Sequence, residues 1–267
     1  MTPTEIKKNL LKYGGKANKH LGQHFLIDNS ALETIVEKAE IKKGDQVLEI
    51  GPGLGVLTRA LIEKGAKILA IEKDRRFIEC LEFDGLDLHI GDAARIEWDQ
   101  LVGEGAWKFV SNLPYAITSL ALRKALYIKH PPELIVVLVQ REVAERVLAR
   151  DGKQSLLSLM VALASFKTEI VRRVPAGAFY PPPKVESAVL KIVPLSNPER
   201  LKKWGVEPEK VMVVAKKGFA HPRKLLQRNL QIESGKWQEL SKSFGFDMKV
   251  RAEDLKVEQW VGLVKGF

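Results

Sequence analysis

A glycine-rich loop flanked by acidic residues is the feature of the sequence that most clearly suggests chemistry. Gly51, Gly53 and Gly55 follow a short apolar run, and Glu49 stands just before them. Glycines in such a turn allow the backbone to approach a nucleotide-like ligand closely. Glu72 follows Gly51 by 21 residues, a spacing at which a carboxylate accepts hydrogen bonds from both hydroxyls of a ribose.

The spacing within the loop and the charge beside it indicate which nucleotide would bind. A dinucleotide fingerprint has the spacing G-x-G-x-x-G and turns a helix N-terminus toward a pyrophosphate, whereas the spacing here is G-x-G-x-G. The Glu49 carboxylate disfavours a phosphate and suits a cationic ligand, such as a sulfonium with its amino-acid tail. Asp92 is placed to accept a hydrogen bond from an adenine amino group. We therefore expect S-adenosylmethionine, with NAD as the alternative. The absence of G-x-x-x-x-G-K-[ST] excludes a P-loop NTPase.

These residues lie at the ends of predicted strands. From about residue 45 onward, short apolar runs alternate with amphipathic helical patterns, which is typical of βαβ units and of a doubly wound parallel sheet. Two later runs flank a loop too rich in proline to form a crossover helix, so we expect them to form an antiparallel pair at the sheet edge. The predicted strands are 46–50, 67–72, 88–90, 108–112, 134–139, 169–174 and 187–193, and two predicted helices are 56–64 and 74–83.

Composition and charge bound the class of protein. The chain has 267 residues, one cysteine (Cys80), no apolar run near the ~18 residues of a membrane span, and no zinc-ligand pattern. We expect a cytoplasmic protein without membrane or metal. The formal net charge of +10 lies entirely in residues 1–20 and 198–267. This distribution suggests a polyanion held by the two ends. We expect a basic N-terminal arm (1–20), a central domain that carries the site (21–197) and a basic helical domain that binds the polyanion (198–267).

The residues after the fourth predicted strand suggest a family. Asn112-Leu113-Pro114-Tyr115 resembles the turn of the ribosomal RNA small-subunit adenine N6,N6-dimethyltransferases. The resemblance covers almost the whole chain and implies a Rossmann-like class I methyltransferase sheet with a small C-terminal helical domain. It also implies S-adenosylmethionine as the cofactor. Further stretches match in the same order: Leu21 to Leu26, Glu49 to Gly55, Gln140 to Ala144, Phe179 to Val189 and Phe219 to Leu230.

The chemistry of adenine explains the residue types in this turn. The N6 lone pair is delocalised into the ring, so the amino group is a poor nucleophile. The side-chain oxygen of Asn112 and the backbone carbonyl of Leu113 can each accept one N6 hydrogen, which orients the nitrogen and favours positive charge on it. Pro114 stiffens the turn, and Tyr115 can stack on the base. The resemblance implies that Phe179 covers the other face of the base.

The resemblance also assigns roles to the two ends of the chain. It implies that Gln23, His24 and Leu26 contact the cofactor, although many relatives have Asn where this chain has His24. In the C-terminal segment, Pro222 stands at a predicted first helical position. The basic residues that we expect along an RNA phosphate backbone are Arg223, Lys224 and Arg228.

We therefore expect a monomeric enzyme that dimethylates N6 of two adjacent adenosines near the 3′ end of small-subunit RNA, within an immature small ribosomal subunit. One alternative is a large-subunit RNA methyltransferase of the macrolide-resistance type, but those relatives typically carry Asn-Ile-Pro-Tyr and a less proline-rich loop. A second alternative, suggested by the charge at both ends, is a ribosome-assembly factor whose binding matters more than its catalysis.

Overall fold

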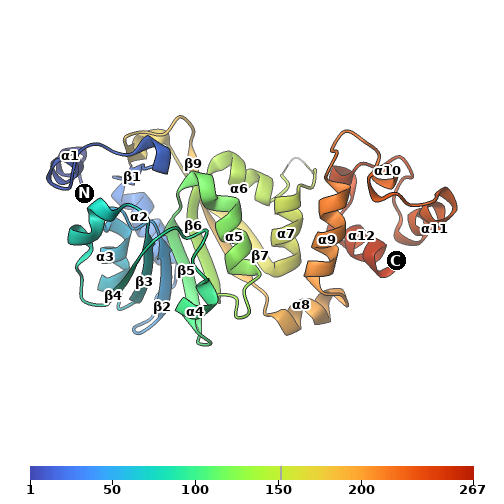
Figure 1. The fold of residues 1–267 in the computed structure, drawn as a ribbon, viewed down its shortest axis with the longest axis horizontal. Helices are drawn as coiled ribbons and strands as arrows, with labels where there is room; N and C mark the ends of the chain where they lie inside the picture. The colour runs from blue at the N-terminus through green and yellow to red at the C-terminus, as the bar shows by residue number, and fades with distance from the viewer. Residues whose placement is uncertain (151) are drawn as a thin grey trace. The chain divides into compact units, whose positions relative to one another are not determined.

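The seven predicted strands form one mixed sheet in the computed structural model, which describes residues 1–150 and 152–267 (Figure 1). The strands are β2 Gln46–Ile50, β3 Lys67–Glu72, β4 Leu86–Ile90, β5 Trp107–Asn112, β6 Leu134–Gln140, β7 Ser165–Val174 and β9 Ser187–Pro194. Their order is β4-β3-β2-β5-β6-β9-β7. Neighbours among β2 to β6 are parallel, and β9 is antiparallel to β6. The predicted α/β fold, with the last two strands adjacent at one edge, is confirmed.

The chain divides into two compact units, of which the first consists of residues 1–144 and 167–194. It contains the sheet, and an apolar cluster packs two of its helices against one face: Ile35 and Leu57 meet Val47, Ile68 and Val110. Because apolar side chains are buried along β2, β3, β5 and β6, these strands appear in the sequence as nearly continuous apolar runs. The helices that begin here are α1 Pro3–Lys12, α2 Asn29–Lys38, α3 Val56–Glu63, α4 Trp98–Val102, α5 Thr118–Leu126 and α6 Arg141–Val147.

Short elements of this unit differ from the sequence-based expectation. The helix predicted over 74–83 is a 3-10 helix, η2 Arg75–Leu81, which begins where the Asp74 side chain accepts a hydrogen bond from the Arg76 amide. Two short strands were not predicted, β1 Phe25–Leu26 and β8 Phe179–Tyr180, and they pair antiparallel. Strands of two residues carry no hydrophobic period that a sequence pattern could show. The remaining 3-10 helices are η1 Lys19–Leu21, η3 Tyr115–Ile117 and η4 Ala176–Ala178.

The second unit consists of residues 145–166 and 195–267. Its central helix, α9, contacts α7, α8, α10 and α12. We predicted one boundary, between residues 197 and 198, whereas segment 145–166 also belongs to this unit. The reason is α7, an almost wholly apolar helix whose buried side chains pack among these helices. Among the described residues, no helix is long and apolar enough to cross a membrane. The helices are α7 Leu156–Ala164, α8 Asn197–Trp204, α9 Pro208–Gly218, α10 Leu226–Leu230, α11 Ser234–Phe244 and α12 Val257–Lys265, with 3-10 helix η5 Ala252–Asp254.

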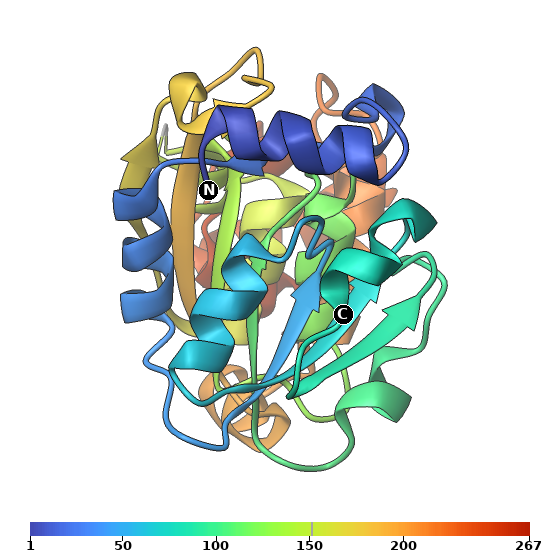
Figure 2. The ribbon, with the colours of Figure 1, turned by 90° about the vertical axis from the view of Figure 1, so that its left-hand side faces the viewer.

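Much of the predicted N-terminal arm is a helix, α1, that packs against the first unit. Helix α1 begins with a capping box between Thr2 and Glu5. Its apolar side chains Ile6 and Leu10, four residues apart, are buried in a cluster that includes Phe77. Figure 2 shows α1 lying across the end of the sheet toward which β2 and β3 point. Within α1, Lys7, Lys8 and Lys12 are exposed on the solvent side of the helix, opposite its buried apolar side chains.

The packing of α1 predicts that Ile6→Ala destabilises the first unit. Ile6 is fully buried, so truncation removes apolar contacts and should lower the free energy of unfolding by about 2–4 kcal/mol. Leu11→Ala on the same helix is the control. Its side chain is 75% exposed, and the change should be below about 0.5 kcal/mol. Denaturant unfolding of the three proteins measures the difference, and equal stabilities would show that α1 contributes no core packing.

Candidate active site

A cavity of about 240 Å³ lies where β2, β3, β4 and β5 end. Its walls come from the segment 20–26, the glycine loop after β2, the ends of β3 and β4, and the turn after β5. In open α/β sheets, ligands bind beyond the carboxyl ends of the strands, at the point where the strand order reverses. The predicted site residues that line this cavity are Gln23, His24, Leu26, Glu49, Gly51, Gly53, Glu72, Asp92, Asn112, Leu113, Pro114 and Tyr115.

Glu72 fixes the glycine loop at the floor of the cavity. Its Oε2 accepts a hydrogen bond of 3.0 Å from the Gly53 amide, and its Oε1 accepts one of 2.7 Å from the Asp74 amide. Gly53 has a φ of +57°, and a Cβ there would lie 3.1 Å from Cε1 of Phe25, so the position favours glycine. Burial raises the pKa of the Glu72 carboxyl, while the two amide donors oppose that shift. The carboxylate is thus held in one orientation beside the loop.

Glu49 lies deeper than Glu72 and accepts its hydrogen bond from a hydroxyl rather than from backbone amides. Its side chain is buried, and Oε2 accepts a 2.8 Å hydrogen bond from the Thr58 hydroxyl. Burial raises the pKa of this carboxyl to about 8, so at neutral pH it is mostly protonated in the absence of a ligand. A cationic group bound beside it would favour the carboxylate. The expected negative charge at Glu49 therefore depends on what occupies the cavity.

Asp92, beyond the end of β4, stays ionised at the cavity rim. Its Oδ2 accepts a hydrogen bond of 2.9 Å from Nζ of Lys73, and its Oδ1 accepts one of 2.9 Å from the Ala94 amide. The hydrogen bond from Lys73 holds the pKa of Asp92 below its usual value. The carboxylate keeps acceptor capacity for a ligand, because each of its oxygens has more than one lone pair.

The turn after β5 presents an oriented amide. Nδ2 of Asn112 donates a hydrogen bond of 3.2 Å to the backbone carbonyl of His24, which leaves Oδ1 as the acceptor on the other side of the amide. Tyr115 is held by a 2.7 Å hydrogen bond between its hydroxyl and that of Ser187, and burial raises the pKa of the Tyr115 hydroxyl. Both residues are therefore fixed by segments distant in the sequence.

Two predicted residues lie differently from expectation. The His24 ring stacks on the Tyr115 ring, with centroids 5.6 Å apart, and its Nδ1 lies 2.8 Å from the carbonyl oxygen of Pro181. The His24 ring therefore lies beside Tyr115, the residue predicted to stack on the target base, as well as at the cavity wall. Phe179 is buried in the core cluster with Leu26, because β8 pairs with β1, and does not line the cavity. Its role beside a base stays a prediction.

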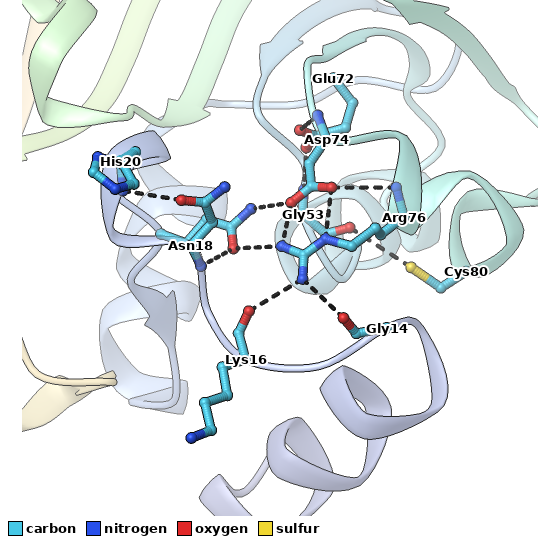
Figure 3. Close-up of polar contacts among 10 residues, drawn as sticks. Gly14, Lys16, Asn18, His20, Gly53, Glu72, Asp74, Arg76 and Cys80 are labelled. Atoms are coloured by element: carbon cyan, nitrogen blue, oxygen red, sulfur yellow. Dashed lines mark hydrogen bonds and ion pairs between the residues drawn. The ribbon is translucent and has the colours of Figure 1, made fainter.

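Gln23 is part of a polar network that the sequence analysis did not identify. Its Nε2 donates a 2.6 Å hydrogen bond to Oδ2 of Asp74, and Asp74 pairs with Arg76 (Figure 3). The hydrogen bonds from Arg76 lower the pKa of Asp74. In the sequence, this network is visible only as Asp74 and Arg76, which follow shortly after the strand that ends at Glu72. Charged residues at such a position are common on solvated surfaces, so they do not indicate a buried network.

The predicted RNA-binding residues lie in the second unit. Arg223, Lys224 and Arg228 are exposed, and Lys224 and Arg228 line a separate cavity with Lys217 and His221. No acidic residue lines this cavity among the residues that the structure describes. The prediction that a helix begins at Pro222 is wrong: residues 221–224 form a turn, and the short α10 begins only at Leu226. Arg223 and Lys224 are thus presented by a turn that precedes α10, whereas Arg228 lies on α10 itself.

The raised pKa of Glu49 predicts that the free energy of unfolding falls as the pH rises. Its pKa is about 8 in the folded protein, against an ordinary value of 4.5, so the folded state binds the proton more tightly than the unfolded chain does. Its contribution to the free energy of unfolding is fully present below about pH 4.5 and is lost as the pH rises through about 8. Glu49→Gln cannot titrate and should remove that loss.

Denaturant unfolding of wild type and Glu49→Gln across this pH range measures the effect. The matched control is Glu63→Gln on the exposed surface of α3, which should leave the wild-type decline in place. A decline of equal slope in Glu49→Gln and wild type would contradict the assignment to Glu49.

Comparisons with known proteins identify the family. A family model described as "Ribosomal RNA adenine dimethylase" matches residues 14–267. The ribosomal RNA small subunit methyltransferase A of Dehalococcoides mccartyi strain BAV1 is 38% identical over 266 residues, covering 96% of this chain and 90% of that protein. A dimethyladenosine transferase structure from Plasmodium falciparum is 25% identical with a TM-score of 0.70, covering 90% of this chain and 96% of that one. The 23S rRNA methyltransferase ErmE has a TM-score of 0.71 at 24% identity, covering 91% and 98%, which is a likeness of fold alone. The chain therefore belongs to the ribosomal RNA adenine dimethylase family, whose members are S-adenosylmethionine-dependent methyltransferases.

Proposed function

We propose that this protein transfers methyl groups from S-adenosylmethionine to N6 of two adjacent adenosines near the 3′ end of 16S ribosomal RNA, giving N6,N6-dimethyladenosine. One observation carries the proposal: the Asn112–Tyr115 turn, the glycine loop and Glu72 line the same cavity. The substrate assignment is supported by the relative in Dehalococcoides mccartyi, a small subunit methyltransferase that aligns over almost the whole chain.

The acidic residues of the cavity fit the cofactor by their chemistry. Glu72, held beside the glycine loop, would accept hydrogen bonds from the ribose hydroxyls, and Asp92 would accept one from the adenine amino group. Glu49 would lie toward the cationic methionine end, where a positive charge favours its ionised form. Gln23, His24, Leu26, Gly51 and Gly53 would form the remaining contacts. The cofactor supplies an electrophilic methyl group.

The turn after β5 would then align the target base. Oδ1 of Asn112 and the Leu113 carbonyl would each accept one N6 hydrogen, because the His24 carbonyl already engages the amide nitrogen of Asn112. These acceptors favour the positive charge that develops on N6 as it is alkylated. The nitrogen becomes acidic as it gains charge, so a strong general base is not required. The His24 ring would support one face of Tyr115, leaving the other face for the base.

The partner is proposed from charge and from family. Helix α1 and residues 223–228 carry basic side chains that would contact RNA phosphates, which dominate the affinity of such complexes. We assign the substrate as an immature small ribosomal subunit, met in the cytoplasm, and the protein as a monomer. The large-subunit alternative is not favoured, because the likeness to the 23S rRNA methyltransferase ErmE lies in the fold.

The substrate assignment predicts a product in one subunit. The protein is incubated with S-adenosylmethionine and with undermodified small or large ribosomal subunits in separate reactions, and RNA nucleosides are analysed by mass spectrometry. We expect N6,N6-dimethyladenosine in small-subunit RNA alone. The product in large-subunit RNA alone would favour the resistance-type enzyme, and the absence of methylated adenosine from both would contradict the proposed substrate.

The role of Asn112 predicts a loss of methylation with cofactor binding largely intact. Asn112→Ala removes one oriented acceptor and should lower the methylation rate at least about 100-fold. Calorimetry should show little change in affinity for S-adenosylmethionine. Asn197→Ala, at an exposed asparagine of the second unit, is the control and should keep wild-type activity. Full activity of Asn112→Ala would refute the role, and its ability to restore subunit maturation without methylation would support the assembly-factor alternative.

A further inference from the structure

The guanidinium of Arg76 joins two parts of the first unit that are far apart in the sequence. On one side it forms a two-pronged pair with Asp74, with Nε 2.9 Å from Oδ1 and Nη2 2.6 Å from Oδ2. On the other side, Nη1 donates hydrogen bonds of 3.1 Å to the Lys16 carbonyl and 3.4 Å to the Gly14 carbonyl (Figure 3). Arg76 therefore links η2 to the segment that follows α1.

Asp74 extends this link to the cavity. Its side chain is only 7% exposed and also accepts the 2.6 Å hydrogen bond from Gln23, while its amide donates to Glu72. Glu72 in turn accepts the hydrogen bond from Gly53 of the glycine loop. Gln23 is further tied to its own segment, because its Oε1 accepts a 2.7 Å hydrogen bond from the Asn18 amide. A continuous set of hydrogen bonds thus runs from the end of α1 to the floor of the cavity.

Apart from the 3-10 helix η1, the segment 14–23 has no regular secondary structure. It contains Gly14 and Gly15, both with positive φ, and glycine loses much conformational freedom on ordering. Helix α1 is anchored by its apolar side chains, and Ala17 packs against the same cluster, while the contacts that tie the segment to Asp74 and Arg76 are polar. If the segment were not held, a ligand would have to order it, and its apparent affinity would fall.

We propose that Arg76 is a positioning residue that holds segment 14–23 in place, so that the cofactor cavity is formed before the cofactor arrives. The inference rests on the proposed function, since it takes the cavity to be that of S-adenosylmethionine. Arginine suits the role because its planar fork engages a carboxylate while a further nitrogen reaches backbone carbonyls. Lysine offers a compact charge that keeps the attraction to Asp74 without this geometry.

The test compares Arg76→Gln and Arg76→Lys with a matched control, Arg75→Gln. Arg75 is adjacent and exposed, and within the described part of the chain its side chain has no hydrogen bond or ion pair. Calorimetry with S-adenosylmethionine should show binding roughly 10- to 100-fold weaker in Arg76→Gln, an intermediate loss in Arg76→Lys, and wild-type affinity in Arg75→Gln. The KM for the cofactor should rise similarly, with kcat at saturating cofactor within about two-fold of wild type.

A second pair of variants leaves Arg76 itself unchanged. Gly14 has a φ of +100°, and a Cβ there would lie 3.3 Å from Cδ of Arg76, whereas a Cβ at Gly15, with a φ of +124°, would meet nothing within 4 Å. Gly14→Ala should therefore weaken cofactor binding more than Gly15→Ala, although both carry backbone strain. Limited trypsin digestion should cleave after Lys16 faster in Arg76→Gln than in wild type, and added cofactor should restore protection.

Three results would overturn the proposal. They are wild-type cofactor affinity in Arg76→Gln, a fall in kcat at unchanged KM, and equal losses in Arg75→Gln and Arg76→Gln. Far-UV circular dichroism of each variant distinguishes unfolding of the protein from displacement of segment 14–23. If Arg76→Gln does not fold, the cofactor affinities of Gly14→Ala and Gly15→Ala decide whether the proposal holds. Failure of the wild-type protein to bind S-adenosylmethionine would instead refute the proposed function, so the two failures are distinguishable.

Discussion

The buried carboxylate of Glu72 is the constraint on which the site depends. It stands at the end of β3 and receives backbone amide hydrogen bonds from the glycine loop and from the start of η2. A carboxylate removed from water must have its lone pairs satisfied, and here the donors are backbone groups whose positions are set by adjacent strands. The loop, the strand end and the 3-10 helix are therefore fixed relative to one another by a single side chain, which leaves little freedom to the cavity between them.

The electrostatics of the cavity contrast with those of the chain as a whole. The protein has a formal net charge of +10, yet Glu49, Glu72 and Asp74 are all buried at or beside the cavity. Of these three, Asp74 alone has a cationic side chain against it within the described residues, and the pKa values shift accordingly: lowered for Asp74, raised for Glu49 and Glu72. The buried Glu49 carboxyl, whose pKa is raised to about 8, gains a favourable partner when a cation binds beside it and gains none from a phosphate, so the cavity favours a cationic ligand over an anionic nucleotide.

The sheet could be predicted from sequence because the apolar side chains of β2, β3, β5 and β6 are buried and amphipathic helices separate several of the strands. The same reasoning located the residues at the strand ends, where Glu49, Glu72 and Asn112 meet at one cavity. Contacts set by distant pairing could not be predicted. The two-residue strands that pair Leu26 with Phe179 are too short to show a hydrophobic period. In the sequence, Asp74 and Arg76 resemble a surface ion pair, because their contacts with residues 14–23 are apparent only in the folded structure. Segment 145–166 was misplaced because it interrupts the first unit in sequence but packs with the second.

The pairing of β1 with β8 determines when the site can form during synthesis. The His24 ring reaches the carbonyl of Pro181, a partner 157 residues later in the chain, and Phe25 pairs with Tyr180. Chains emerge from the ribosome N-terminus first, at roughly 5–20 residues per second, so the strands around the glycine loop are available many seconds before these partners exist. A nascent chain can therefore build the floor of the cavity early, while the wall that carries His24 is completed only after residue 181 has emerged. The enzyme becomes competent late in its own translation.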